Sequence, residues 1–334
     1  MAKQLICLGI ESTAHTFGIG ITKNRKVVAN VLDGYKTQKG GIIPTEAAKH
    51  HHDVRERILS TALENAGITL EEVDLISYSR GPGLAPCLHE GFRFAKELSL
   101  KTQKPIVGVN HCIAHLEIGK LLTKAKDPVL LYASGANTQV IAYAAGKYRV
   151  FGETLDMGVG NFIDTFARSA GLGFPGGPRI SELADNGKDL IEIPYVVKGM
   201  DVSFSGILTN LEQKFKSRKY KMEDLAFSLQ ETAFPMLIEV SERAMAHLHK
   251  KELLLGGGVA SNKRLQEMGS IMCRERKGKF FCPERQFLTD NGAMIAWLGV
   301  LCKKNAVKWD KIKGSPSINI FPYERTDDVE VNWK

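Results

Sequence analysis

The chain repeats one order of strands and turns about half its length apart. Residues 5–31 contain an apolar strand, a small polar turn, a second strand, a charged turn and a third strand (LICLGI, ESTAHT, FGIGI, KNRK, VVANV). Residues 129–152 repeat that order (VLLYA, SGANT, QVIAY, AAGKY, RVFG). Each copy has the alternating or continuous apolar character of a three-stranded meander, and helical segments and further strands follow it. Two such copies predict a duplicated α/β domain with a cleft between its halves.

The length of 334 residues is too great for one small core, which also favours two lobes. We expect the first lobe at residues 1–125, completed by residues 300–334, and the second at residues 126–299. The six cysteines are scattered with no CxxC pair, so we interpret them as small buried hydrophobes in a reducing compartment. The apolar start at Leu5 is broken by Glu11, and no run approaches a membrane span, so a cytoplasmic location is expected.

Small polar residues and glycines follow three of the predicted strands. Hydroxyls and amides in the first turn of each copy suit phosphate, and a glycine loop after a later strand would let a nucleotide lie against bare backbone. The residues concerned are Ser12, Thr13 and Thr16, then Ser134, Gly135, Asn137 and Thr138, and finally residues 255–262 (LGGGVASN). Each loop alone is weak support, because tight turns use the same residues. The sequence has neither a Walker A nor a Rossmann fingerprint, so those families are not supported.

A histidine pair directly after a short strand is the strongest chemical signal. An apolar strand at residues 106–109 ends at Asn110, and a helix is predicted to begin at once with His111 and His115 on one face. Two imidazoles at this spacing can hold a transition metal with ligands from elsewhere in the fold, or they can simply cap and pack the helix. The spacing matches the zincin motif H-E-x-x-H, but Cys112 replaces the glutamate base, which weakens a protease interpretation.

A net charge of +8 favours a polyanionic partner. The excess is concentrated in three basic runs, at residues 214–221 (KFKSRKYK), 274–279 (RERKGK) and 303–313. Such runs are equally typical of a solvated lysine-rich face. Charge alone therefore leaves nucleic acid binding and a plain solvated surface as alternatives.

Motifs along the whole chain resemble one family. In chain order they read GIESTAHT, GGIIPTEAAKHH, SRGPGLAP, PIVGVNHCIAHLEIG, LYASGANTQVIAY, VFGETLDMGVGN, GFPGGPRISELA, VKGMDVSFSGILT, SLQETAF, LGGGVASNKR and LTDNGAMIAW. Together they resemble the universal tRNA threonylcarbamoyladenosine transferases (the TsaD, KAE and OSGEP group, once misnamed O-sialoglycoprotein endopeptidase), and VKGMD and NHCIAH resemble the archaeal or eukaryotic type. The fold that this resemblance implies is α/β, the duplicated actin-like ATPase and Hsp70 fold (ASKHA, ribonuclease H-like), with a nucleotide cleft between two lobes.

The resemblance also implies a site. The family's metal ligands fall on His111, His115, Tyr132 and Asp290, although Tyr132 could equally be a core strand tyrosine and Asp290 a helix N-cap. One divalent metal per subunit is implied, Fe²⁺ first, with Zn²⁺ or Mg²⁺ as alternatives; two imidazoles, a phenolate and a carboxylate suit iron or zinc better than magnesium. ATP or an adenylate would lie in the cleft. Its contacts fall on Tyr132, Ala133, Ser134, Gly135, Ala136, Asp164, Gly177 and Asn262.

Two positions near the predicted nucleotide contacts depart from the family pattern. Family members commonly read SGGNT, where this chain has Ala136 in place of the second glycine, so this position requires an unstrained φ. Archaeal relatives usually have a glutamate where Ser181 stands; the adjacent Glu182 would face about 100° away on a helix. That ribose contact stays open, and no general base is assigned.

The activity implied by the resemblance is acyl transfer. A separate threonylcarbamoyl-adenylate synthase would make the adenylate, and this chain would pass its threonylcarbamoyl group to the exocyclic amine of the adenosine 3′ of the anticodon, in tRNAs that read codons beginning with A. The basic surface would then bind the tRNA anticodon loop. The implied partners are those of the KEOPS complex, a small kinase-like ATPase and small accessory subunits, with no membrane.

Two other activities are alternatives. An ATPase or kinase-like phosphotransferase would share the fold without needing the histidine pair. A metallopeptidase would need a base where Cys112 stands.

Overall fold

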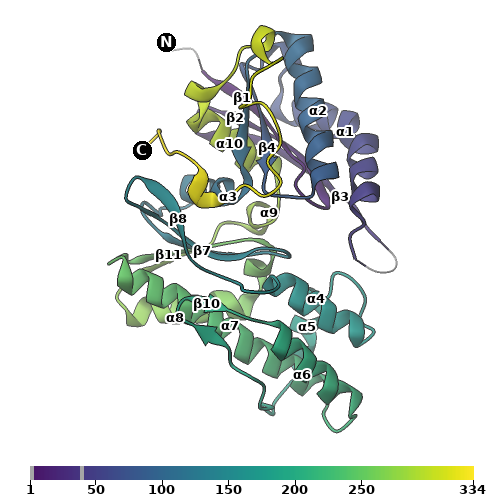
Figure 1. Ribbon diagram of the computed structural model, residues 1–334, viewed down its shortest axis with the longest axis vertical. Helices are drawn as coiled ribbons and strands as arrows, with labels where there is room; N and C mark the ends of the chain where they lie inside the picture. Colours follow the sequence, from purple (N-terminus) through teal and green to yellow (C-terminus); the bar gives the residue numbers. More distant parts are fainter. Residues whose placement is uncertain (1–3, 38–40) are drawn as a thin grey trace. The chain divides into compact units, whose positions relative to one another are not determined.

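The structure of the protein is a computed structural model that describes residues 4–37 and 41–334 (Figure 1). Each of its two compact units has a hydrophobic core made of its own strands and helices. The units are Met1–Leu121 together with Asp290–Lys334, and Leu122–Thr289.

The boundary of the second unit differs from the expected one. The sequence placed residues 290–299 in the second lobe, whereas the helix that begins at Gly292 packs against three strands of the first unit, β1 (Ile6–Glu11), β2 (Thr16–Lys23) and β4 (Leu75–Gly81). That helix is almost wholly buried and apolar, so it belongs with the sheet that covers it.

The first unit is a five-stranded sheet with helices on both faces. Its elements are β1 (Ile6–Glu11), β2 (Thr16–Lys23), β3 (Lys26–Gly34), α1 (Pro44–Ala66), β4 (Leu75–Gly81), α2 (Ala85–Thr102), β5 (Ile106–Asn110), α3 (His111–Leu122) and α10 (Gly292–Leu301), with short 3₁₀ turns at Leu70–Glu72, Lys303–Asn305, Trp309–Lys311 and Thr326–Asp328. The strand order is β3-β2-β1-β4-β5, in which β1, β4 and β5 run parallel and β2 is antiparallel to both its neighbours. Helices α1 and α2 cover one face and α10 the other (Figure 1).

The second unit repeats this sheet. Its elements are β6 (Val129–Ala133), β7 (Thr138–Ala144), β8 (Lys147–Glu153), α4 (Val159–Ser169), α5 (Gly177–Ala184), β9 (Val197–Lys198), β10 (Asp201–Val202), α6 (Ser205–Lys216), α7 (Met222–His247), β11 (Glu252–Gly256), a 3₁₀ turn (Gly258–Ser261), α8 (Lys263–Glu275), β12 (Lys279–Phe281) and α9 (Arg285–Leu288). The order β8-β7-β6-β11-β12 matches β3-β2-β1-β4-β5 strand for strand, and again the first strand of the meander is parallel to the two strands that follow it in the chain. The predicted duplication is confirmed.

Local signals in the sequence fix the ends of several elements. Helix α1 has Pro44 in its first turn and ends at Gly67, whose φ of +61° is the left-handed conformation that closes a helix. Helix α3 begins at His111 directly after β5, as expected. All six cysteines are free and five are buried, which confirms their interpretation as small hydrophobes.

Helix α10 approaches the first sheet more closely than side chains would allow. A Cβ on Gly9 would lie 2.1 Å from the backbone nitrogen of Ala296, and one on Gly20 would lie 2.0 Å from that of Ala293. The backbones of helix and strands are therefore in direct contact. This contact fixes the start of α10, which follows Asp290 by two residues.

No helix within the described part of the chain is long and apolar enough to cross a bilayer.

We predict that Gly9→Ala strongly destabilises the first unit. The added methyl group meets helix backbone, which cannot move aside as a flexible side chain would, and overpacking of this kind costs about 1–3 kcal/mol or more. The measurement is the denaturant midpoint of unfolding. Gly206→Ala on α6 is the control, because no atom lies within 4 Å of its added methyl group. Equal midpoints for wild type and Gly9→Ala would contradict this account of the packing.

Candidate functional site

The first turn of α3 places two histidines side by side. Asn110 ends β5, and its Oδ1 accepts a hydrogen bond from the backbone N–H of Ile113 at 3.1 Å, which caps the helix. His111 and His115 then lie on one face, with ring centroids 4.9 Å apart and ring planes at 80°. Both histidines are buried. The helix thus presents two imidazoles from one rigid element.

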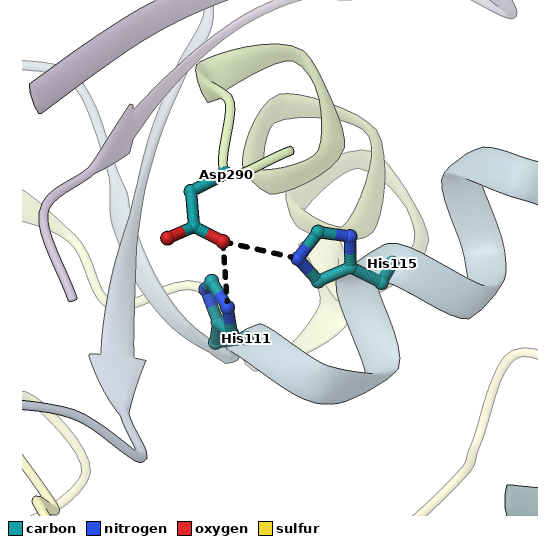
Figure 2. A group of neighbouring side chains, drawn as sticks. All are labelled: His111, His115 and Asp290. Atoms are coloured by element: carbon teal, nitrogen blue, oxygen red, sulfur yellow. Dashed lines mark ion pairs between the residues drawn. The ribbon is translucent and has the colours of Figure 1, made fainter. Parts of the chain in front are cut away.

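A carboxylate from a distant part of the sequence faces this pair. Figure 2 shows Asp290 with one oxygen directed at both rings. The Nε2 atoms of His111 and His115 each lie 3.4 Å from Asp290 Oδ1. One ligand atom from each residue lies within 4.8 Å of the others. All three residues belong to the first unit.

Asp290 is not the N-cap of α10. That role belongs to Asn291, whose side chain accepts a hydrogen bond from the backbone N–H of Met294 at 3.0 Å. The sequence had left the cap as an alternative reading of Asp290, and the structure assigns the cap to the next residue. The Asp290 carboxylate therefore faces the histidines instead of its own helix.

Glu11 also belongs to the candidate site, although no spacing pattern in the sequence indicated it. This carboxylate is fully buried at the end of β1, and its Oε2 lies 2.9 Å from Nδ1 of His111. Its Oε1 accepts hydrogen bonds from both the N–H and the hydroxyl of Thr13, each at 2.6 Å. An ionised carboxylate only accepts, so His111 donates from Nδ1 and keeps the lone pair of Nε2 for the side that faces Asp290.

The only sequence signal for Glu11 is an acidic residue at the end of an otherwise apolar strand. Its partner is 100 residues away, so spacing could not reveal the contact.

The pKa values of Asp290 and His115 are both lowered, for different reasons. Burial would raise the pKa of Asp290, but the neighbouring His111 and His115 hold the pKa well below the ordinary value. Burial lowers the pKa of His115, and the hydrogen bond to Asp290 opposes this only in part. A carboxylate and a neutral imidazole are the states in which these side chains bind metal.

The donor set fits a divalent transition metal. Two imidazole nitrogens and one carboxylate oxygen suit iron or zinc better than magnesium, which prefers oxygen ligands and water. The Nδ1–carboxylate contact of His111 is the kind of outer contact that orients metal-binding histidines. The fourth predicted ligand, Tyr132, is buried on β6 in the second unit, and its part in the site stays a prediction.

Cys112 does not replace the glutamate of a protease. Burial raises the pKa of its thiol to about 11, so the thiol stays protonated at neutral pH. A buried thiol of this kind is an inert structural group and neither a base nor a nucleophile.

The loop after β6 contains most of the predicted nucleotide residues. Ser134 closes it, because its Oγ accepts from the N–H of Asn137 and its N–H donates to the carbonyl of Asn137. The carbonyl oxygens of Ser134 and Gly135 accept from the first turn of α4. Gly257, with a φ of +89°, lies against this loop, since an added Cβ would be 2.3 Å from the carbonyl oxygen of Ala133. The second unit therefore brings two of the predicted glycine-containing loops into direct backbone contact.

The remaining predicted nucleotide residues lie around α5 in the same unit. Asp164 accepts a hydrogen bond from the N–H of Gly176 at 2.7 Å, directly before Gly177. An added Cβ on Gly177 would meet no atom within 4 Å. Asn262 caps α8 with its Oδ1 and donates from Nδ2 to Gln230 at 2.6 Å. Its amide thus already orders the start of α8.

The structure shows the backbone and the neighbours of the two positions that depart from the family pattern. Ala136 is absent from the residues with positive φ, so the missing glycine leaves no backbone strain. Ser181 lies 3.3 Å from the Asn262 amide, while Glu182 is exposed and pairs with Arg179.

Polar groups of the first turn of the first unit form hydrogen bonds within the protein, and their role in phosphate binding stays a prediction. The N–H of Ser12 donates to the hydroxyl of Ser79, and both donors of Thr13 bind Glu11. Ser12 and Thr13 are buried, and Thr16 is also buried as the first residue of β2. The donors of Thr13 therefore hold Glu11 beside His111.

Comparison with solved structures first identifies the class of fold. HypF in its full-length, phosphate- and nucleotide-bound form has a similar fold, with a TM-score of 0.62 and 10% sequence identity over 91% of this chain and 47% of that one. The repeated β8-β7-β6-β11-β12 and β3-β2-β1-β4-β5 sheets are those of the ASKHA class, which confirms the predicted fold class.

The family follows from the sequence. Residues 26–297 match the family TsaD: tRNA N6-adenosine threonylcarbamoyltransferase. A tRNA N6-adenosine threonylcarbamoyltransferase of Thermococcus kodakarensis is 56% identical over 98% of this chain and 100% of that protein. A probable bifunctional tRNA threonylcarbamoyladenosine biosynthesis protein of Methanocaldococcus jannaschii is 52% identical over 98% of this chain, which spans 60% of that longer protein. The chain belongs to the tRNA N6-adenosine threonylcarbamoyltransferase family, as its motifs predicted.

We predict that Glu11→Gln weakens metal binding at the histidine pair. A glutamine can turn its oxygen either to Thr13 or to His111, and an NH₂ group facing His111 reverses the ring tautomer, which puts a proton on Nε2. Loss of such an outer contact lowers metal affinity about 10- to 100-fold. Titration of metal-free protein with Zn²⁺ against a competing chelator measures this, with Thr13→Ser as the control that keeps the hydroxyl. Unchanged affinity in Glu11→Gln would refute the tautomer argument.

Proposed function

We propose that this chain transfers a threonylcarbamoyl group from threonylcarbamoyl-adenylate to the N6 amine of the adenosine 3′ of the anticodon in tRNAs that read codons beginning with A. The support is family membership over nearly the whole chain, combined with one structural observation. Within the stretch that matches the family, His111, His115 and Asp290 come together although Asp290 is 175 residues from His115 (290 − 115 = 175). Neither histidine packing nor a helix cap requires this convergence.

The proposal assigns His111, His115 and Asp290 as metal ligands, with Tyr132 as a further ligand. A divalent metal, Fe²⁺ in first place, would supply positive charge next to the adenylate phosphate. The chain's own contribution is to hold two imidazoles and a carboxylate at one point. Glu11 keeps His111 in the required tautomer, and the cap of α3 keeps both rings on one face.

The reaction is an acyl transfer that needs an activated donor. The N6 amine is conjugated with the adenine ring and is a weak nucleophile. Its nitrogen forms a bond to the carbamoyl carbon, the bond from that carbon to the phosphate oxygen breaks, AMP departs, and the amine loses one proton. A mixed anhydride has a leaving group good enough for this step. An anticodon-loop base is already unpaired, so it is presented at low cost.

The second unit supports a site for the adenylate or ATP. Neighbouring glycines pack directly against the loop from Tyr132 to Ala136 and hold its backbone in place, and Gly135 within the loop has no side chain to keep a phosphate away. Asp164 and Gly177 lie together at the start of α5, where a carboxylate can accept from ribose hydroxyls. Asn262 serves this site by ordering the start of α8.

A basic cluster on the second unit supports a tRNA partner. It consists of Lys214, Lys216, Arg218, Lys219 and Lys221, at the end of α6 and in the turn that follows it. Among the described residues, none of the five forms an ion pair with a carboxylate, and four of them are exposed. Lys214 lies 5.1 Å from the ring centre of the exposed Tyr220. Cations beside an exposed aromatic ring suit a nucleic acid, whose phosphates and bases both find partners.

Partner subunits are part of the proposal. We infer that a threonylcarbamoyl-adenylate synthase supplies the donor, and that a small kinase-like ATPase and small accessory subunits of the KEOPS type complete the tRNA surface, all in the cytoplasm. The bifunctional biosynthesis proteins among the relatives, of which this chain spans 60%, are consistent with a second activity working beside this one. A net charge of +8 is modest for an enzyme that binds tRNA alone.

The proposed function is tested by mass spectrometry of nucleosides. Unmodified tRNA is incubated with this protein, the adenylate synthase, threonine, bicarbonate, ATP and the accessory subunits. The expected product is threonylcarbamoyladenosine at the position 3′ of the anticodon. His115→Ala is expected to lose most of the bound metal and the product, whereas His52→Ala, an exposed histidine paired with Glu90, retains both. No modified nucleoside with the complete set of proteins would refute the proposal.

We predict that the basic cluster contributes to tRNA affinity through phosphate contacts. Replacing Lys216, Arg218 and Lys219 by alanine should weaken binding and reduce the slope of log K against log salt by about one per lost contact. Fluorescence anisotropy with labelled tRNA at several salt concentrations measures both. The charge-matched control replaces three exposed lysines of the first unit, Lys23, Lys26 and Lys101. Equal slopes for both triple variants would show that the cluster is only a solvated surface.

A further inference from the structure

After α10 the chain returns along the ends of β4 and β5. The backbone N–H of Phe321 donates to the carbonyl of Arg80 at 2.6 Å, and the N–H of Gly83 donates to the carbonyl of Pro322 at 3.1 Å. A Cβ on Gly81 would lie 1.9 Å from the carbonyl oxygen of Phe321. The path of this segment is therefore set by the backbone of β4. We call residues 319–333 the C-terminal brace.

Glu324 is the polar centre of the brace. Its Oε1 lies 2.6 Å from Nη2 of Arg80, and its Oε2 accepts from Nε of Arg80 at 3.2 Å. The same Oε2 accepts from Nδ2 of Asn110 at 3.0 Å. The Glu324 and Arg80 side chains are 10% and 22% exposed, so this pair is shielded from most of the solvent. A two-point pair of this kind holds the carboxylate in one orientation.

Asn110 connects this carboxylate to the histidine helix. Its Nδ2 donates to Glu324, and its Oδ1 accepts from the N–H of Ile113 in the first turn of α3. Because Glu324 can only accept, it fixes which end of the Asn110 amide faces the helix. Asn110 is 1% exposed, so water cannot replace either contact.

The brace contacts α3 at two more points. The hydroxyl of Thr326 is hydrogen-bonded to the thiol of Cys112, and the indole Nε1–H of Trp333 donates to Glu117 at 3.3 Å. Between these anchors, the brace and the ends of β4, β5 and α10 enclose a cavity of about 350 Å³. The brace therefore reaches α3 through polar contacts at Cys112 and Glu117, in addition to the one made through Asn110.

Two of the three brace contacts, those of Asn110 and Glu117, are separated from the histidines around the helix, whereas the Cys112 contact lies on another face. At about 100° per residue, Asn110 and Glu117 lie on one face of α3, and the two histidines lie roughly a quarter-turn or more away. The histidines face Glu11 and Asp290, which belong to other elements. Any rotation or shift of α3 would move both Nε2 atoms relative to Asp290 at once.

We propose that the C-terminal brace sets the rotation and position of α3, and that Glu324 is a positioning residue for the His111–His115 pair. The proposal rests on the metal role of that pair given above. Glu324 acts through Asn110 and does not contact the metal ligands. The proposal is therefore tested by metal affinity, by the visible spectrum of bound Co²⁺ and by hydrogen exchange of α3. None of these measurements needs the transfer reaction.

The test exchanges donor and acceptor between two positions. Asn110→Asp keeps a good N-cap but places a carboxylate against Glu324, whereas the double variant Asn110→Asp with Glu324→Gln restores a donor–acceptor pair without changing the net charge. Co²⁺ is the probe, measured by its affinity and its visible spectrum in metal-free protein. We expect Asn110→Asp to lose about tenfold in affinity, at the low end for outer contacts of metal ligands. The double variant should return close to wild type in both affinity and spectrum.

A matched control breaks an ion pair elsewhere in the same unit. Glu97→Gln on α2 removes the ion-pair partner of Arg55 on α1, and this change should leave the Co²⁺ spectrum unchanged. Wild-type affinity in Asn110→Asp, or a double variant as weak as the single one, would overturn the proposal. Circular dichroism shows whether a variant has unfolded. In that case Glu324→Gln alone is compared with wild type, and its Co²⁺ affinity is expected to lie between those of wild type and Asn110→Asp.

Failure of the metal site is distinguishable from failure of the brace. If wild type and His115→Ala bind Co²⁺ equally, the metal assignment is wrong. Hydrogen exchange of the peptide that covers residues 106–122 in metal-free protein still tests the brace. Asn110→Asp should speed exchange in the first turn of α3, and the double variant should slow it again. Identical exchange in all three proteins would overturn the brace by itself.

Discussion

The direct backbone contact between α10 and strands β1 and β2 is the constraint on which the first unit depends. Gly9 and Gly20 leave no side chain between the strands and the helix, so α10 has one position against the sheet. Asp290 precedes this helix by two residues and is carried to the start of α3. Since the cap of α10 is Asn291, the aspartate is available to the histidines. The candidate site is thus a consequence of close packing.

Two carboxylates then control α3 from different sides. Glu11 accepts from Thr13 and His111, and Glu324 accepts from Arg80 and Asn110. A buried carboxylate is stable only when donors surround it, so each of these contacts has few alternative arrangements. One carboxylate sets the protonated nitrogen of an imidazole, and the other sets the amide that caps the helix. The same physical requirement therefore gives both the chemistry and the orientation of the histidine pair.

The duplicated sheets have diverged in the turn that follows their first strand. In the first unit, the turn after β1 uses the donors of Thr13 to hold Glu11 beside His111. In the second unit, the turn after β6 closes on itself through Ser134, with Gly257 against its backbone. The first arrangement orients a histidine of the candidate metal site, whereas the second holds a glycine-containing loop by backbone contacts. One topology therefore provides two different kinds of site, which illustrates that fold alone does not fix function.

The sequence by itself determined what depends on neighbours along the chain. Periodicity gave the two meanders, Pro44 and Gly67 marked the ends of α1, and the four-residue spacing put His111 and His115 on one helical face. The motifs of the whole chain also predicted the family. Only the tertiary structure decided the rest. Whether an aspartate caps a helix or faces an imidazole depends on where that helix packs, and the contacts of Glu11 and Glu324 span 100 and 214 residues. A sequence pattern reports local geometry, whereas such contacts are fixed by how sheets and helices pack in three dimensions.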